Sequence, residues 1–406
     1  MKNWEKKKLG DVCSFVRGPF GGSLKKNIFK QDGYAVYEQQ HAIYDQFDDV
    51  RYFIDEKKFN EMKRFELNSG DLIMSCSGTM GKIAIVPENI KRGIINQALL
   101  KLSPSKKVSN IFLKLWMQSE SFQNSLKEYA GGAAIQNVAS VAILKQIEIP
   151  LPPLPEQRRI VSILDEAFTA IEKAKANAEQ NLKNAKELFE SYLQGVFENK
   201  GEGWEEKTLE EVCEISSKLI DPKKSEFQNL IHIGAGNIES QKGTLIDLKT
   251  AKEENLISGK FLFDDSMILY SKIRPYLMKV VNCEFQGLCS ADIYPLLPIK
   301  GKMIKDFLYH LLLTKDFTDY AILGSQRAGM PKVNREHLFA YKLFLPSIKE
   351  QQNIVQKLDA LSAETQKLEN IYQNKINDLE ELKKSVLQKA FSGELNEKRK
   401  RLHEVE

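Results

Sequence analysis

The chain has 406 residues, of which 42% are hydrophobic and 28% charged, with a net charge of +4. At roughly 100–200 residues per domain this length predicts two to four domains, and the apolar fraction excludes a wholly disordered chain. The charge favours an acidic partner such as nucleic acid only weakly. The sequence has neither the ~20-residue apolar stretch of a membrane helix nor the apolar run of a secretory signal. Its five cysteines form no C-x-x-C pair, so we expect a cytoplasmic protein without disulfides or a bound metal.

The first part of the chain, residues 1–154, predicts a mixed α/β domain. Short β-rich runs at 71–76 and 82–86 are separated by turn signals. A segment with helical spacing follows at 111–129, and an apolar strand at 147–151 leads into prolines, which end the strand.

A long helix is predicted over residues 155–200. Pro155 suits the first helical position and Glu156 the positive end of the helix. Apolar residues then recur at alternating steps of three and four, which is the spacing of a coiled-coil seam. The predicted seam positions are 160, 164, 168, 171, 178, 182, 185, 189, 192 and 196. Positive and negative charges balance, which indicates a solvated amphipathic helix rather than a basic DNA-binding arm.

The second half of the chain repeats the first. Three blocks match in order at nearly constant shifts of 200 and 194 residues. The matched blocks are 4–13 with 204–213, 151–165 with 345–359, and 191–197 with 385–391. Such a pattern indicates a tandem duplication with a unit near 200 residues, too long for a solenoid repeat.

The repeat predicts a second α/β domain at 201–346 and a second long helix with a tail at 347–406. Within that domain we expect strands at 266–270, 277–281 and 342–345 and a helical segment at 304–320. Ser347 and Glu350 form an S-x-x-E pattern, which predicts a capping box at the start of the second helix. Its predicted seam positions are 354, 358, 361, 368, 372, 376, 379, 382, 386 and 390.

These elements predict a pseudo-twofold molecule. Two α/β (α+β) domains in tandem duplication are joined by two long helices that pair as an antiparallel coiled coil. The end of the second helix is then expected beside Trp4, because the end of the first helix leads to the equivalent Trp204. At ~1.5 Å per residue, helices of this length reach ~60 Å, which corresponds to roughly 18 base pairs of B-DNA.

No residue pattern predicts catalysis. The five histidines lie in no H-E-x-x-H motif, and the chain has no phosphate-binding G-x-x-x-x-G-K-[ST] loop. Gly234 and Gly236 form a G-x-G after a strand-like run, but the third glycine and the following helix of a dinucleotide site are missing. We interpret this segment as a tight turn, without a cofactor.

Several loops of both copies have the composition of a nucleic-acid interface. They combine glycine with cations and hydroxyls, which suit phosphates, and with arginine and amides, which suit base edges. The candidate DNA-binding residues are Arg17, Lys25, Lys26, Ser77, Thr79, Lys82, Gln136, Asn137, Lys218, Lys272, Arg274, Tyr276, Lys279, Gln326, Arg327 and Lys332. Solvated turns are the alternative, in which Arg274 pairs with Asp264 or Asp265. Corresponding loops carry the same residue types in different sequences, which favours two readers of different targets.

Three motifs carry a resemblance to a known family. They are Trp-x4-Leu-x2-Val at Trp4 and Trp204, the runs Gly-Asp-Leu-Ile and Ile-Leu-Tyr-Ser-Lys-Ile-Arg-Pro, and the junction I-P-L-P-P-L-x-E-Q-x-x-I-V-x-x-L-D. The second copy departs from the junction at 347–349, where Ser-Ile-Lys replaces Pro-Leu-Pro. Over nearly its whole length, the chain resembles the specificity (S) subunit, or HsdS, of type I restriction–modification systems.

The resemblance implies a division of labour. Each domain is a target recognition domain that binds one half of a bipartite double-stranded DNA site, while the helices set the spacing and dock methyltransferase (M) subunits, expected to be two. The M subunits supply S-adenosylmethionine and adenine methylation, and restriction (R) subunits supply ATP- and Mg-dependent cleavage. The chain itself is then a non-catalytic subunit with no cofactor. Two alternatives remain at this stage, a duplicated coiled-coil scaffold or adaptor without DNA specificity and a stand-alone nuclease.

Overall fold

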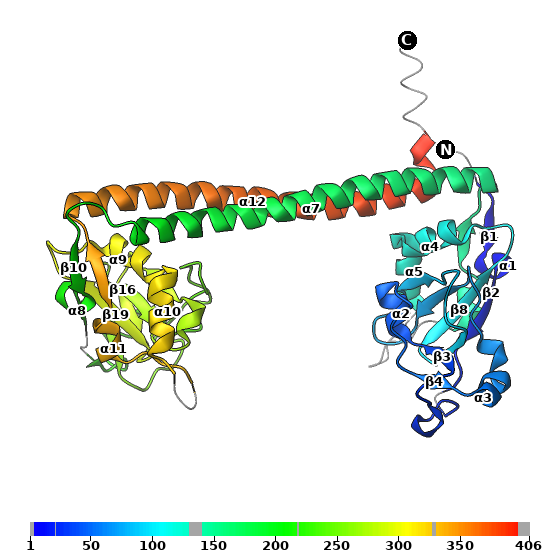
Figure 1. Ribbon diagram of the computed structural model, residues 1–406, viewed down its shortest axis with the longest axis horizontal. Helices are drawn as coiled ribbons and strands as arrows, with labels where there is room; N and C mark the ends of the chain where they lie inside the picture. Colours follow the sequence, from blue (N-terminus) through cyan, green and yellow to red (C-terminus); the bar gives the residue numbers. More distant parts are fainter. Residues whose placement is uncertain (1–3, 21, 130–139, 217–218, 327–329, 397–406) are drawn as a thin grey trace, which may run out of the picture. The chain divides into compact units, whose positions relative to one another are not determined.

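The computed structural model describes residues 4–20, 22–129, 140–216, 219–326 and 330–396 (Figure 1). The chain forms two compact units, one comprising residues 1–178 and 374–406 and the other residues 179–373. Two 45-residue helices, α7 (Leu154–Glu198) and α12 (Ile348–Ser392), each contribute one part to each unit. Within the described ranges, no helix is long and apolar enough to span a bilayer.

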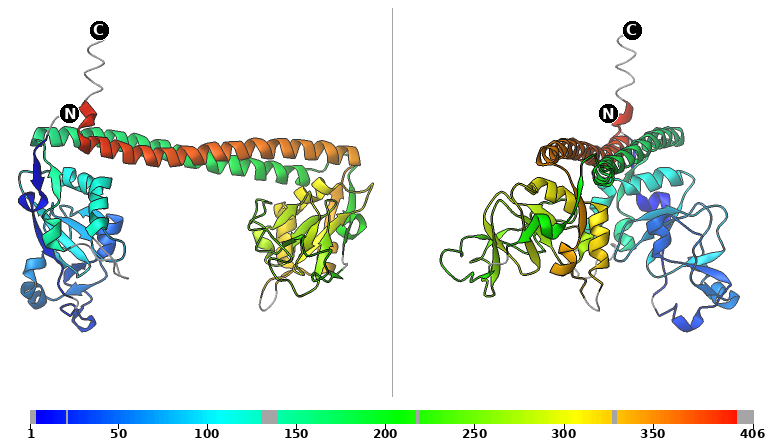
Figure 2. Two further views of the ribbon diagram at one scale, coloured as in Figure 1. Left: turned by 180° about the vertical axis from the view of Figure 1, so that it is seen from behind. Right: turned by 60° about the vertical axis from the view of Figure 1, so that its left-hand side comes forward.

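The first unit contains an α/β domain. In chain order its elements are β1 (Lys6–Lys8), α1 (Leu9–Val12), β2 (Cys13–Arg17), η1 (Lys26–Ile28), β3 (Tyr34–Tyr37), α2 (Gln39–Tyr44), β4 (Phe53–Ile54), α3 (Glu56–Glu61), η2 (Lys63–Phe65), β5 (Leu72–Ser75), β6 (Ile83–Ile85), β7 (Gly93–Ile95), β8 (Leu99–Pro104), α4 (Asn110–Gln118), α5 (Glu120–Tyr129), α6 (Val141–Leu144) and β9 (Glu148–Pro150). The unit also contains η4 (Glu394–Asn396), which follows α12. An antiparallel sheet has the order β2-β8-β5-β6, a second sheet the order β4-β3-β7, and β1 pairs with β9. Helix α4 lies between the first sheet and α7 (Figure 2).

The second unit repeats the four-stranded sheet and the paired first and last strands of the first domain, while its second sheet has five strands instead of three. Its elements are β10 (Glu205–Thr208), α8 (Leu209–Val212), β11 (Cys213–Ile215), β12 (Leu219–Ile220), β13 (Ile231–Ile233), β14 (Lys249–Thr250), β15 (Lys260–Phe263), β16 (Ile268–Ser271), η3 (Pro275–Leu277), β17 (Val280–Asn282), β18 (Gly287–Cys289), β19 (Ile293–Pro298), α9 (Lys305–Leu312), α10 (Lys315–Leu323), α11 (Arg335–Phe339) and β20 (Lys342–Leu345). The sheet β11-β19-β16-β17 corresponds to β2-β8-β5-β6, and β10 pairs with β20 as β1 pairs with β9. The predicted duplication of a mixed α/β domain is confirmed.

Three predicted elements differ in detail from those observed. The strand expected at 277–281 begins only at Val280, because a 3₁₀ turn containing Pro275 precedes it. Each expected helical segment is two helices, since the chain turns at Ser119 between α4 and α5 and at Thr314 between α9 and α10. Both residues have extended backbone angles, which interrupt the helix.

The long helices pair in opposite directions, as predicted. In the first unit, Glu172 of α7 pairs with Lys383 of α12 at 3.0 Å, and Lys175 pairs with Glu380 at 2.6 Å. Residue numbers therefore rise along one helix while they fall along the other. Exposed ion pairs of this kind contribute little to stability because water screens them, so the buried apolar seam supplies most of the stability of the pairing.

The ends of the two helices contact their domains in the same way. In the second unit, Phe197 near the end of α7 lies 5.1 Å from Phe307 of α9, measured between ring centroids. In the first unit, Phe391 near the end of α12 lies 5.2 Å from Phe112 of α4. Trp4 packs on the same apolar cluster as Phe391, which confirms the expected position of this helix end.

The predicted seam is correct for part of each helix. Ile160, Leu164, Ile171, Ala178 and Ala185 of α7 are buried, as are Leu358, Ile376 and Ala390 of α12. The prediction is wrong at Tyr192, Leu368 and Leu382, which are 40%, 37% and 47% exposed. Leu193 and Thr365 are buried instead. An α-helix has 3.6 residues per turn and drifts ~20° per heptad from a 3.5-residue repeat, so the buried stripe of α7 shifts from Tyr192 to Leu193. Thr365 lies four residues after Leu361 on the seam face of α12, and the apolar pattern missed it because it is polar.

The capping box predicted for α12 forms only in part. The Ser347 hydroxyl accepts a hydrogen bond from the backbone N–H of Glu350 at 3.3 Å. The Glu350 carboxylate, however, accepts from the indole N–H of Trp204 at 2.9 Å. The carboxylate thus ties the start of the second domain to the start of its helix.

Candidate nucleic-acid interface

In the second domain, the structure brings two of the predicted loops together. Residues 272–279 connect β16 to β17, and residues 330–333 run beside them. Val333 N–H donates to the carbonyl of Lys272, and Arg274 N–H donates to that of Pro331, both at 2.9 Å. Ile273 and Lys332 also form a β-bridge. These backbone bonds hold the two segments together, so the cations that they carry have fixed positions relative to one another.

Lys272 is held by its own domain. Its ammonium donates to the Ala291 carbonyl and lies 5.0 Å from the centre of the Tyr294 ring. Burial and the neighbouring Lys332 ammonium lower the pKa of Lys272, and the Asp292 carboxylate opposes this shift. Lys332 in turn lies 3.7 Å from the Asp292 carboxylate. Lys272 therefore supports the loop and is poorly placed to bind phosphate.

Arg274 is the exposed cation of this loop. Its backbone is left-handed, with φ 50° and ψ 62°, an uncommon conformation for a residue with a Cβ atom. In the part of the chain that the structure describes, neither Asp264 nor Asp265 forms an ion pair with it. Asp264 instead accepts hydrogen bonds from Ser266. Tyr276, two residues further on, is 50% exposed. The turn thus presents a cation and an aromatic ring to solvent.

Sequence reasoning missed one cation of this cluster. Arg335, the first residue of α11, lies with its guanidinium 6.0 Å from the Tyr294 ring, the ring that Lys272 also faces. It follows the predicted loop by three residues, and only the fold of β19 brings Tyr294 beside it. Arg335 is exposed.

The other predicted residues of the second domain have separate positions. Lys279 donates through its ammonium to the carbonyl of Ala235 at 2.5 Å, so it holds the Gly234–Gly236 turn. Gln326, which follows α10, is exposed. Lys218 and Arg327 lie outside the described residues, as do Gln136 and Asn137 of the first domain.

In the first domain, the hairpin between β5 and β6 carries three predicted residues. Thr79 and Lys82 are exposed and Ser77 is half-buried. The hairpin is closed by Lys82 N–H, which donates to the Ser75 hydroxyl at 3.0 Å. Arg17, at the end of β2, lies beside Cys76 at the base of this hairpin. Burial raises the pKa of the Cys76 thiol to about 12, and the nearby Arg17 opposes the shift. Thr79 and Lys82 are thus the exposed predicted residues of this hairpin, whereas the cluster of the second domain exposes Arg274 and Arg335.

Lys25 and Lys26 belong to another loop of the first domain. Both side chains are exposed, at the start of η1. The loop is anchored by Leu24, which is buried, while Phe20 is 93% exposed. Among the described residues, no hydrogen bond or ion pair joins Lys25 or Lys26 to the β5–β6 hairpin.

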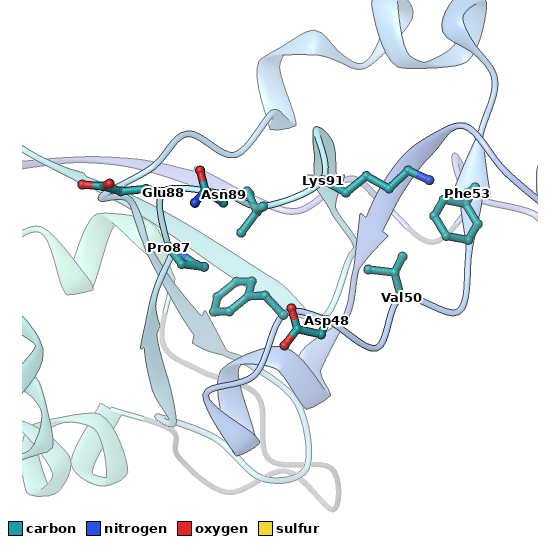
Figure 3. Close-up of a pocket in the computed structure, with 9 residues that line it drawn as sticks. Asp48, Val50, Phe53, Pro87, Glu88, Asn89 and Lys91 are labelled. Carbon is teal, nitrogen blue, oxygen red and sulfur yellow. The ribbon is translucent and has the colours of Figure 1, made fainter.

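A hollow in the first domain is lined by Asp48, Val50, Phe53, Lys91 and residues around them (Figure 3). Lys91 extends toward Phe53, with its ammonium 4.5 Å from the ring centre, and also pairs with Asp32. The ammonium of Lys91 is therefore engaged within the domain. Across the described ranges, no group of three His, Cys, Asp or Glu side chains could hold a metal ion.

Comparison with known proteins identifies the family of the chain. The model of the type I restriction modification DNA specificity domain matches residues 1–180 and again residues 201–378. The chain belongs to this family. The predicted resemblance to specificity subunits is therefore confirmed, and both copies of the specificity domain are matched separately.

Characterised specificity subunits resemble the chain over different lengths. The type I restriction enzyme EcoDI specificity subunit of Escherichia coli is 31% identical over 62% of this chain and 63% of that protein, so the chain spans less than two thirds of this relative. The MjaVIII specificity subunit of Methanocaldococcus jannaschii is 23% identical over 98% of this chain and 94% of that protein.

Solved structures share the fold of the specificity subunit. A chain from a study of complex assembly and conformational transition of the type I R-M system has a TM-score of 0.77 at 18% identity, with 97% of this chain and 99% of that chain covered. The HsdS subunit from Thermoanaerobacter tengcongensis has a TM-score of 0.63 at 18% identity and covers 97% and 98%. At this identity the likeness establishes the fold of two domains and two long helices.

Proposed function

We propose that this specificity subunit directs a type I restriction–modification complex to a bipartite double-stranded DNA site. Each recognition domain reads one half of the site, and the long helices set the distance between the halves. The observation that carries the proposal is the pair of specificity domains with one fold and different exposed loops.

The loop chemistry supports two different half-sites. The second domain presents Arg274 and Arg335, and arginine suits guanine through two parallel hydrogen bonds to O6 and N7. The first domain presents Thr79 and Lys82 on a closed hairpin, where a hydroxyl can accept or donate and the lysine suits phosphate. We therefore assign the two domains different sequence preferences.

The partners follow from the same proposal. The subunit docks methyltransferase subunits, two in number, which carry S-adenosylmethionine, and restriction subunits, which carry ATP and Mg. The subunit itself contributes recognition without catalysis. Lys332 and Lys82 supply only a few phosphate contacts, and cations of the partner subunits add to the affinity for DNA.

Adenine methylome sequencing of a host that carries the intact system tests the proposal. We expect one methylated motif with two specific halves separated by a non-specific spacer, lost when the gene for this chain is deleted. A contiguous motif, or methylation that persists after the deletion, would contradict it.

The alternatives have their own signatures, and nothing in the comparisons supports either of them. A scaffold without DNA specificity predicts a complex that binds all duplexes equally. A stand-alone nuclease predicts metal-dependent cleavage by the purified chain.

A further inference from the structure

We propose that Gln157 and Gln351 are positioning residues that fix how each long helix leaves its recognition domain, and thereby restrict the half-site spacings that the subunit accepts. This inference rests on the proposed function, in which the helices set the spacing. It concerns the glutamine of the junction motif, to which family membership alone assigns no role.

In the first unit, the Gln157 side chain joins three segments. It lies in the first turns of α7 and has an exposed fraction of 0%. Its carbonyl oxygen accepts from Ser109 N–H at 2.8 Å, and its amide nitrogen donates to the carbonyls of Lys107 at 3.1 Å and Pro152 at 2.8 Å. One amide thus connects the helix to the loop before α4 and to the segment that follows β9.

The second unit repeats this arrangement. Gln351 of α12 also has an exposed fraction of 0%. Its carbonyl oxygen accepts from Ile304 N–H at 2.9 Å, and its amide nitrogen donates to the carbonyls of Lys302 at 2.8 Å and Pro346 at 2.9 Å. The three partners occupy the same places, in the loop before α9 and in the segment after β20. The bond set is retained although Ile304 stands where the first copy has Ser109, while the other two partners are a lysine and a proline in both copies.

Only a side-chain amide of this length can pair with the backbone N–H and both backbone carbonyls at this position. The three bonds use one acceptor and both donors, and all partners are backbone groups, so the geometry does not depend on the partner side chains. A carboxylate keeps the acceptor but loses both donors, and an apolar side chain leaves buried backbone groups without a partner. The amides therefore fix the backbone on both sides of the point where helix and domain meet.

A small rotation at this point has a large effect along the helix. A helix of 45 residues is ~67 Å long, so a rotation of about 5° at one end displaces the other by about 6 Å, or roughly two base pairs. Loss of either amide is expected to broaden the range of accepted spacings. The loops that contact bases belong to other parts of the domain and keep their structure.

The test uses the complex of the specificity subunit with its M subunits and the variants Gln157→Leu and Gln351→Leu. Binding is measured on duplexes with both half-sites at the native spacing, at spacings one base pair shorter and longer, and with one half-site base changed. We expect the preference for the native spacing to fall about tenfold, the order of one lost hydrogen bond, with half-site discrimination within about twofold of wild type. Gln157→Glu retains the side-chain length and the hydrogen-bond acceptor. It replaces Gln157→Leu in the same measurement if the leucine variant does not fold.

Gln123→Leu provides the matched control. Gln123 lies in the same domain, and its amide donates to the carbonyls of Gly81 at 3.0 Å and Met117 at 2.7 Å, away from α7. Because Gly81 belongs to the β5–β6 hairpin, this variant is expected to affect half-site discrimination and to spare the spacing preference.

Two results would overturn the inference. One is an unchanged spacing preference in folded Gln157 and Gln351 variants. The other is a parallel loss of spacing preference and half-site discrimination, which is the mark of a purely structural role. If the wild-type complex shows no preference for any spacing or binds no duplex specifically, the proposed function itself fails.

Discussion

Insertion of four residues near Ala178 of α7 and of four near Tyr372 of α12 is expected to lengthen the spacer of the methylated site by about two base pairs. Four helical residues add ~6 Å, and one base pair of B-DNA spans ~3.4 Å. Both half-sites are expected to stay the same, because the recognition domains and their junctions with the helices are untouched. Methylome sequencing of a host carrying the variant provides the measurement.

The single insertions are the controls. Because the helices run antiparallel, an insertion in α7 alone shifts Glu172 and Lys175 against Lys383 and Glu380 or leaves part of the buried seam unpaired. Each single insertion is therefore expected to reduce methylation rather than to lengthen the spacer. An altered half-site with an unchanged spacer in the double insertion would defeat the idea that the helices set the spacing.

Arg274→Ala is expected to weaken binding of the cognate duplex by roughly 1–3 kcal/mol and to relax one base position in one half-site. The side chain is exposed and has no ion pair among the described residues, so its removal leaves the domain intact. Arg274→Lys is the matched control, because lysine keeps the charge but lacks the planar fork that binds guanine through two bonds. Compared with Arg274→Ala, we expect Arg274→Lys to recover affinity for duplexes of any sequence, while discrimination at the relaxed base position stays low.

Lys332→Ala and Lys272→Ala separate phosphate contacts from support of the loop. Loss of a phosphate contact weakens binding to all duplexes alike and lowers the salt slope by about one. We expect this of Lys332→Ala, while Lys272→Ala changes the loop itself, because its ammonium is bound to Ala291 and faces Tyr294. Binding across a salt series distinguishes the cases, and unchanged affinity, specificity and salt slope in all the variants would remove this loop from the interface.

The architecture could be predicted from the sequence because the sequence of the repeating unit occurs twice in the chain. Matched blocks at nearly constant shifts identify the duplication, and the absence of proline and the 3/4 apolar spacing identify the long helices. The detail of the seam could not be predicted over 45 residues. The drift of an α-helix buries Leu193 in place of Tyr192, and Thr365, four residues after Leu361, is a polar residue that the apolar pattern passes over.

The candidate interface could be predicted only as a set of loops. Sequence alone cannot say which cations remain available, because Lys272 and Lys279 are bound by carbonyls from distant segments, Ala291 and Ala235. Arg335 was missed for the same reason, since a non-local contact places it in the cluster. The Glu-Gln pair could be seen in the motif, but the bonds of Gln157 exist only once the domain has folded.

Replacement of residues 1–150 with the first recognition domain of another family member tests the central claim most directly. The first domain makes its own contacts with α7 and the end of α12 inside one unit, so the exchange leaves the second domain unaltered. Methylome sequencing of a host that carries the chimera is expected to show a changed first half-site, with the second half-site and the spacer as in the parent. A change in both half-sites together, or in neither, would contradict the claim that the two domains recognise their half-sites independently of each other.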